Sequence, residues 1–111
     1  MEENIMNWIY LITAGIFEIV WATTMKLSHG FSKLNFTILT IIGMIASFLF
    51  LAKATKLLPL SIAYPIWTGI GAVGSIIVGV TLFGDKISPI TWIFITLLLI
   101  SIIGIKLTTN N

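Results

Sequence analysis

Four long apolar runs dominate the sequence and constrain its fold more than any other feature. They cover residues 5–25, 36–52, 62–83 and 90–107, and the second and third contain no charged residue. Each run comes close to the ~20 residues, within a range of about 17–25, that a helix needs to cross a bilayer. We therefore predict an all-α integral membrane protein with four transmembrane helices, forming a single domain over residues 1–111.

The composition and the breaks between the runs support this prediction. Hydrophobic residues make up 58% of the chain and charged residues only 9%, whereas about a quarter of the residues in a soluble domain are charged. The breaks KLSHGFSKLN, KATKLLPLS and FGDKISP contain the residues expected at helix ends. Gly30 is expected to cap the first helix and Pro59 to open the third, while Asp85 and Ser88 suit the turn before the fourth.

Several classes of function are not expected from this sequence. It has no cysteine and only one histidine, His29, so we expect no disulfide, metal site or cofactor. The lysines are scattered, which does not fit a nucleic-acid-binding surface. Residues 69–74, GIGAVG, match a dinucleotide-binding fingerprint, but they lie inside an apolar run without the strand that this motif requires. We interpret Gly69, Gly71 and Gly74 as sites of close helix packing, and as a point where the third helix can bend.

The lysines are divided evenly between the two membrane sides that four spans create. One side holds Lys53, Lys56 and Lys106, and the other holds Lys26, Lys33 and Lys86. Because lysine and arginine bias in short loops sets the orientation, an even division predicts no strong preference. We expect dual topology and an antiparallel homodimer, an arrangement that supports alternating access to a site at the membrane midplane. An orientation fixed by charge position or by a partner chain is the alternative.

Glu18 is the single acidic residue within the four runs. A bare charge near mid-membrane costs roughly 2.5–3.5 kcal/mol or more, so such residues usually face a bundle interior or a wet cavity and act there. Gly15 and Trp21 share its helix face at spacings of three residues. We therefore predict that Glu18 binds protons and a cationic substrate. The alternative is a protonated glutamate that hydrogen-bonds to a neighbouring helix in a purely structural role.

Polar and aromatic residues in the second and third runs are candidates for lining the same site. Tyr64 and Trp67 lie one helical turn apart, and their rings would attract a cation. Ser47 interrupts the apolar second run on the same face as Gly43. The alternatives are that both rings belong to an interfacial aromatic belt, and that the serine bonds to its own helix backbone.

With these residues identified, the chain resembles the small multidrug resistance transporters over nearly its whole length. The four-span plan, the glutamate of the first span, LSHGF, LP…AY.IWTGIGAVG and the IIGIKL ending carry the resemblance. Trp21 in GIFEIVWA, together with WTGIG, is similar to the guanidinium-exporter subtype, because quaternary-ammonium exporters more often have glycine at this position.

The resemblance implies a bacterial inner-membrane protein that works as an antiparallel dimer, with Glu18 of both subunits in one shared site. The positions that match the lining of that site are Gly15, Trp21, Ser47, Tyr64 and Trp67. The sequence departs from the family pattern at Pro65, where alanine is usual. A proline there removes one backbone hydrogen bond and is expected to affect the direction of Tyr64 and Trp67.

The expected function is proton-coupled export of guanidinium-like cations, which is transport and not enzyme catalysis. Removing a carboxyl group from water favours its protonated form, and a guanidinium ion matches carboxylates with a planar fork of donors. Protons and substrate would then compete for the paired Glu18 residues. Export of quaternary ammonium or other hydrophobic cations, a passive dual-topology channel, and an accessory subunit of a paralogous partner are the alternatives.

Overall fold

The computed structural model describes residues 2–109, with side chains described from Ile5 onward, so the acidic side chains of Glu2 and Glu3 lie outside the described part. This part folds into four helices: α1 (Glu2–Leu27), α2 (Leu34–Ala54), α3 (Leu60–Thr81) and α4 (Pro89–Thr108). All four are long and apolar enough to span a membrane. The predicted class, an all-α chain with four transmembrane helices, is confirmed.

The helix ends differ by a few residues from the ends of the apolar runs. α1, α2 and α4 extend one to three residues beyond their runs, because polar residues such as Lys26 and Lys53 continue the helical backbone into the head-group region. The third helix is instead shifted toward the N-terminus. It ends at Thr81, and Gly84 follows with a positive φ of 70°, so the apolar Phe83 belongs to the loop.

Ser88 and Pro59 occupy the helix ends at which they were expected, whereas Gly30 lies three residues beyond Leu27, the last residue of α1, and does not cap it. Ser88 is the N-cap of α4, and its hydroxyl accepts a hydrogen bond from the backbone N–H of Thr91 at 3.2 Å. Pro59 directly precedes the first residue of α3. After α1 the chain turns through His29, Gly30 and Phe31, all three with φ between 50° and 70°. Only a glycine adopts this region without steric cost, so two non-glycine residues share the turn with Gly30.

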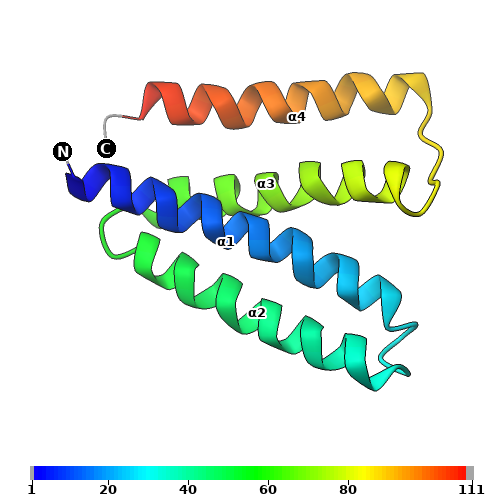
Figure 1. The fold of residues 1–111 in the computed structure, drawn as a ribbon. Helices are drawn as coiled ribbons and strands as arrows, with labels where there is room; N and C mark the ends of the chain where they lie inside the picture. Colours follow the sequence, from blue (N-terminus) through cyan, green and yellow to red (C-terminus); the bar gives the residue numbers. More distant parts are fainter. Residues whose placement is uncertain (1, 110–111) are drawn as a thin grey trace.

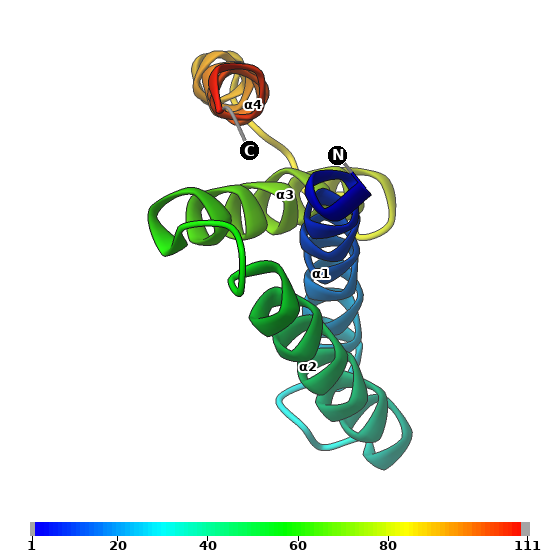
Figure 2. The ribbon, with the colours of Figure 1, turned by 90° about the vertical axis from the view of Figure 1, so that its left-hand side faces the viewer.

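α1 is the central helix of the molecule (Figure 1). It packs along both α2 and α3, whereas the backbone of α4 approaches only α3. Viewed from the end in Figure 2, α4 stands apart from α1 and α2. The largest fully buried side chains include Leu11 of α1 and Leu58 before α3. The core therefore lies among α1, α2 and α3, and α4 contributes no buried residue to it.

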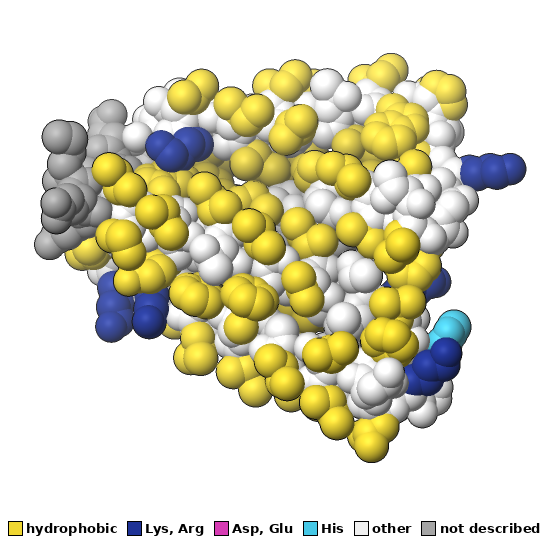
Figure 3. Space-filling view, viewed as in Figure 1, with side chains coloured by type: hydrophobic (Ala, Val, Ile, Leu, Met, Phe, Trp, Pro, Cys, Tyr) yellow, Lys and Arg dark blue, Asp and Glu magenta, His cyan; other side chains and the backbone are white. Residues whose placement is uncertain are grey.

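The remaining surface is apolar along the helices and charged at their ends (Figure 3). Large hydrophobic side chains are widely exposed, for example Leu34 at 74% and Leu107 at 78%. Such extended apolar surface is not tolerated by a soluble monomer, but it suits contact with lipid tails. The lysines visible in Figure 3 lie at the two ends of the molecule, as expected for helices that cross a bilayer.

Candidate functional site

Glu18 lies on the face of α1 that packs against α3, opposite Gly71. A Cβ atom at position 71 would stand 2.6 Å from Glu18 Oε1 and 2.8 Å from Oε2. Real side-chain atoms do not approach so closely, so the carboxylate occupies the space that a larger residue at position 71 would fill. The glycine in α3 thus creates the room for the acid in α1.

Two polar atoms on this part of α1 are buried without a hydrogen-bond partner among the described residues. They are Glu18 Oε2, an acceptor, and Trp21 Nε1, a donor. Leaving one buried polar group unpaired costs about 1–3 kcal/mol, and more for a charged group. Unpaired groups in a native structure commonly mark a place where a ligand, water or another chain binds. Here both lie within one turn of the same helix.

Small residues let the neighbouring helices approach α1 closely around Glu18. One turn before it, a Cβ atom at Gly15 would lie 2.6 Å from Ile70 Cγ2 of α3. One turn after it, Trp21 packs against Gly43 of α2, whose added Cβ would be 3.0 Å from Trp21 Cβ. Gly15 and Gly43 therefore fix how near α3 and α2 lie to the segment that carries the carboxylate.

Ser47 connects three helices through two hydrogen bonds. Its hydroxyl donates to the carbonyl oxygen of Ala14 in α1 at 2.7 Å and accepts from Trp67 Nε1 of α3 at 2.9 Å. Ser47 itself is fully buried. The serine therefore does not bond to its own helix backbone, which was the alternative reading. It holds the turn of α1 that precedes Glu18, and its hydrogen bonds go to the helix backbone and the indole rather than to the carboxylate.

Tyr64 and Trp67 lie side by side on α3 but in different surroundings. Their ring centroids are 5.3 Å apart in an edge-to-face arrangement, and Trp67 makes a similar contact with Phe48 of α2 at 5.7 Å. Trp67 is buried, whereas Tyr64 is 51% exposed. In a single chain Tyr64 therefore faces outward, toward lipid or another subunit, and Trp67 belongs to the core.

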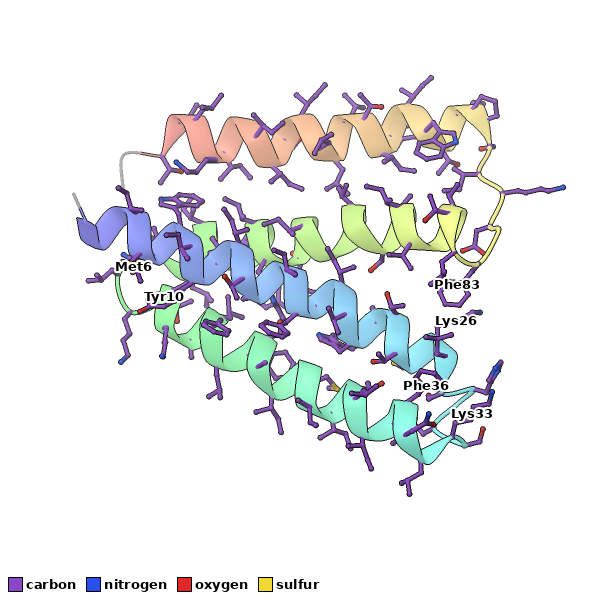
Figure 4. All side chains as sticks on the ribbon, in the orientation of Figure 1. Met6, Tyr10, Lys26, Lys33, Phe36 and Phe83 are labelled. Atoms are coloured by element: carbon purple, nitrogen blue, oxygen red, sulfur yellow. The ribbon has the colours of Figure 1, made fainter. Side chains whose placement is uncertain are left out.

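A cavity of about 190 Å³ begins one helical turn beyond Glu18, between α1 and α3. Ala22 and Ser75 line it, and they lie four residues after Glu18 and Gly71 respectively. At its outer end it is lined by Lys26, Phe83 and Asp85; Figure 4 shows the first two close together at one end of the molecule. The cavity therefore extends from the turn after Glu18 toward the end of the bundle that holds Lys26 and Asp85.

The glycines of GIGAVG serve close helix contacts. A Cβ at Gly69 would lie 2.6 Å from Ile102 Cδ1 of α4, and one at Gly74 would overlap Ile19 of α1. Gly71 faces the Glu18 carboxylate of α1, so the three glycines of the motif bring α3 close to both α1 and α4. α3 continues as a helix through Pro65, and the hydroxyl of Thr68 donates to the carbonyl oxygens of Tyr64 and Pro65.

Two features of this region were not predicted from the sequence. The first is the contact between Gly71 and the Glu18 carboxylate, although Gly71 had been interpreted as a site of close helix packing. The second is the cavity that Lys26 and Asp85 line together. Lys26 and Asp85 are 59 positions apart in the sequence. That they share a cavity is evident only once α1 is seen to pack against α3.

Comparison of the sequence with known proteins shows which family and which relatives it is similar to. The sequence profile of the Small Multidrug Resistance protein family matches residues 6–98. A protein of Escherichia coli (strain K12) named "Guanidinium exporter" is 46% identical over 105 residues, covering 95% of this chain and all of that protein. The protein of the same name from Salmonella typhimurium (strain LT2) is 47% identical with the same coverage, and that from Citrobacter freundii 46%.

The four apolar spans and these bacterial relatives identify the chain as a multi-pass protein of the bacterial inner membrane. The relatives are transporters of a small cation by name, and they match the chain over nearly its whole length. The unpaired polar atoms on α1 therefore have to be interpreted as part of a membrane transport protein.

Proposed function

Because the chain belongs to the Small Multidrug Resistance protein family, we propose that it exports guanidinium and small guanidinyl cations in exchange for protons. Glu18 binds either the cation or a proton. Relatives named "Guanidinium exporter", matched along 95% of the chain, support this substrate class. Trp21, one helical turn after Glu18 on α1, supports it further, because so large a side chain argues against the more open portal that a bulkier quaternary ion would need.

The observation that carries the proposal is the buried Oε2 atom of Glu18, which has no partner among the described residues. A guanidinium ion presents a planar fork of N–H donors that suits the two oxygens of a carboxylate. The indole face of Trp21 attracts a delocalised cation. A bound proton can satisfy the same carboxylate oxygens, so the cation and the proton exclude one another.

Coupling follows from this exclusion. The transporter changes its direction of opening when Glu18 carries either a cation or a proton, and an inward proton gradient then drives the cation outward. The cavity lined by Ala22 and Ser75 begins one helical turn beyond Glu18 and would form the outer part of a route to one membrane surface. On the other side of Glu18 from this cavity, Ser47 and Trp67 link α1, α2 and α3 through their hydrogen bonds.

The working unit in this proposal is an antiparallel homodimer in which both copies of Glu18 share one site. The even division of lysines between the two membrane sides supports insertion in both orientations. α4 has no buried residue in the single chain, and Tyr64 is half-exposed beside the buried Trp67. A second copy would cover α4 and bring its own Tyr64 and Glu18 to the site.

Transport currents from the purified protein, reconstituted alone into liposomes on a solid-supported membrane, test this function. We expect guanidinium to evoke a current in the wild type and none in the Glu18→Gln variant, which keeps the side-chain shape but removes the charge. Thr96→Ala, in the exposed part of α4, is the matched control and should retain the current.

The result distinguishes the proposal from its rivals. Currents evoked by tetrapropylammonium but not by guanidinium would assign the protein to export of quaternary ammonium ions. A current that persists in Glu18→Gln, and that does not depend on a proton gradient, would indicate a passive channel. Silence toward every cation would leave the protein as a subunit that needs a paralogous partner.

A further inference from the structure

A second cavity lies away from Glu18, between α4 and the helices α1 and α3, near the end of α4 that carries Lys106. Its volume is about 210 Å³. It lies within the predicted membrane spans of all three helices. The cavity, here called the α4 groove, is lined by Trp8, Ile12, Ile66, Ile70, Ile102, Ile103, Lys106 and Leu107.

The walls of the α4 groove are chemically uniform apart from one residue. Isoleucine side chains from three helices form most of the surface, so a water molecule there would lack the two to four polar partners that it needs. An alkyl chain has no such requirement and would bury apolar surface. The groove is therefore suited to a lipid tail.

The exception is Lys106, the single charged residue that lines the groove. It lies in the last turn of α4, where the helix reaches the head-group region. Its Nζ atom stands 4.5 Å from the centroid of the Trp8 ring. This contact places the ammonium beside Trp8, at the end of the groove formed by the last turn of α4.

We propose that the α4 groove binds an anionic phospholipid, with an acyl chain between α3 and α4 and the phosphate on Lys106. The inference is independent of the transported ion. Charge complementarity decides between a lipid and a second copy of the chain as the occupant. α4 contains no acidic residue, so a partner's α4 lying there would not supply a counter-charge for Lys106.

Other lysines on the same membrane side provide a contrast. Lys53 and Lys56 line an open surface pocket with Asn7, Tyr10 and Leu57, and Lys53 stands over the Tyr10 ring at 5.5 Å. No run of aliphatic side chains extends from this pocket between two helices among the residues that line it. Lys53 and Lys56 can attract anionic head groups, but the residues that line their pocket do not form a groove for an acyl chain.

Native mass spectrometry of the purified full chain tests the proposal, using phosphatidylglycerol and phosphatidylcholine with identical acyl chains at equal concentration. A lysine near the surface attracts an anionic lipid by about 1 kcal/mol, or about fivefold. We expect the wild type to retain about fivefold more phosphatidylglycerol. Lys106→Gln should abolish this preference, whereas Lys56→Gln should keep it.

A second pair of variants tests the acyl chain. Ile103→Trp fills the groove and should reduce retention of both lipids, while Ile42→Trp, on exposed α2 surface outside the groove, should not. Equal losses in Lys106→Gln and Lys56→Gln would overturn the proposal. Full displacement of the lipid by glycerol 3-phosphate would also overturn it, because the acyl chain would then have no part in binding. The proposal would likewise fail if the wild type retained no lipid and Ile103→Trp lost the dimer.

Discussion

At the scale of single residues, the site depends on a glycine as much as on the acid. Glu18 could be predicted from the sequence because a carboxylate in an apolar run is conspicuous and costly. Its contact with Gly71 could not, since that depends on how α1 and α3 rotate about their own axes. The same rotation decides that Trp67 is buried and Tyr64 exposed. Their spacing of three residues along the sequence does not distinguish the two side chains.

Gly71→Ala should weaken guanidinium binding. The added methyl group would stand 2.6 Å from Glu18 Oε1, so the carboxylate must turn away and lose a charge-assisted hydrogen bond to the cation. Such a bond contributes about 1.5–3 kcal/mol, so we expect the dissociation constant to rise about tenfold or more. Isothermal titration calorimetry with guanidinium measures this dissociation constant.

Gly104→Ala is the control for this substitution, because an added Cβ at position 104 meets no atom within 4 Å. It should leave the dissociation constant unchanged. If Gly71→Ala bound guanidinium as tightly as Gly104→Ala does, the contact between position 71 and the carboxylate would have no role in binding.

At the scale of helices, the hydropathy of the sequence predicts the elements well and their packing poorly. Four apolar runs were sufficient to predict four helices, because a membrane span must satisfy its backbone hydrogen bonds internally. Their ends shifted where polar residues continue a helix. The isolation of α4 from α1 and α2 could not be predicted, since all four runs are similarly apolar.

Ser47→Ala should destabilise the packing of α1, α2 and α3. The substitution removes the hydrogen bonds to the Ala14 carbonyl and from Trp67 Nε1 and leaves the Trp67 indole N–H buried without a partner, whereas the Ala14 carbonyl keeps its bond within α1. Side-chain hydrogen bonds between membrane helices contribute about 0.6–2 kcal/mol each, so we expect a clear decrease in Tm in detergent.

Thr96→Ala again provides the comparison, because the Thr96 hydroxyl donates only to the Trp92 carbonyl within α4. Its Tm should stay near the wild-type value. Equal Tm values for the two variants would mean that the Ser47 contacts do not stabilise the bundle.

At the scale of the whole molecule, the proposed transport function requires two copies of the chain in opposite orientations. Adding one positive charge should disturb the even division of lysines. Ser32→Arg, in the exposed first loop, raises that side to four charges, while Leu57→Arg, also exposed, raises the other. Each variant should insert mainly in one orientation and transport poorly alone, because an antiparallel pair needs both.

Co-expression of the two variants should restore guanidinium resistance in cells, and labelling of an introduced cysteine from each membrane side reports the orientation. Full activity of either variant alone in a single orientation would show that the working unit is not antiparallel.

Competition between protons and substrate also sets the dependence of binding on pH. A proton on Glu18 occupies the oxygens that the cation needs, so lowering the pH raises the apparent dissociation constant for guanidinium. While the site is protonated, the constant should change by about tenfold per pH unit for each proton displaced. Titrations across a series of pH values measure this slope; a flat profile would mean that no proton leaves when guanidinium binds.

Proton flux in proteoliposomes tests whether the Glu18 carboxylate exchanges guanidinium for protons. Vesicles are loaded with guanidinium and a pH-sensitive dye, then diluted into medium without the cation at equal pH. We predict that the interior acidifies as guanidinium leaves, and that Glu18→Gln vesicles show neither flux. Guanidinium efflux without a change in interior pH would contradict the account.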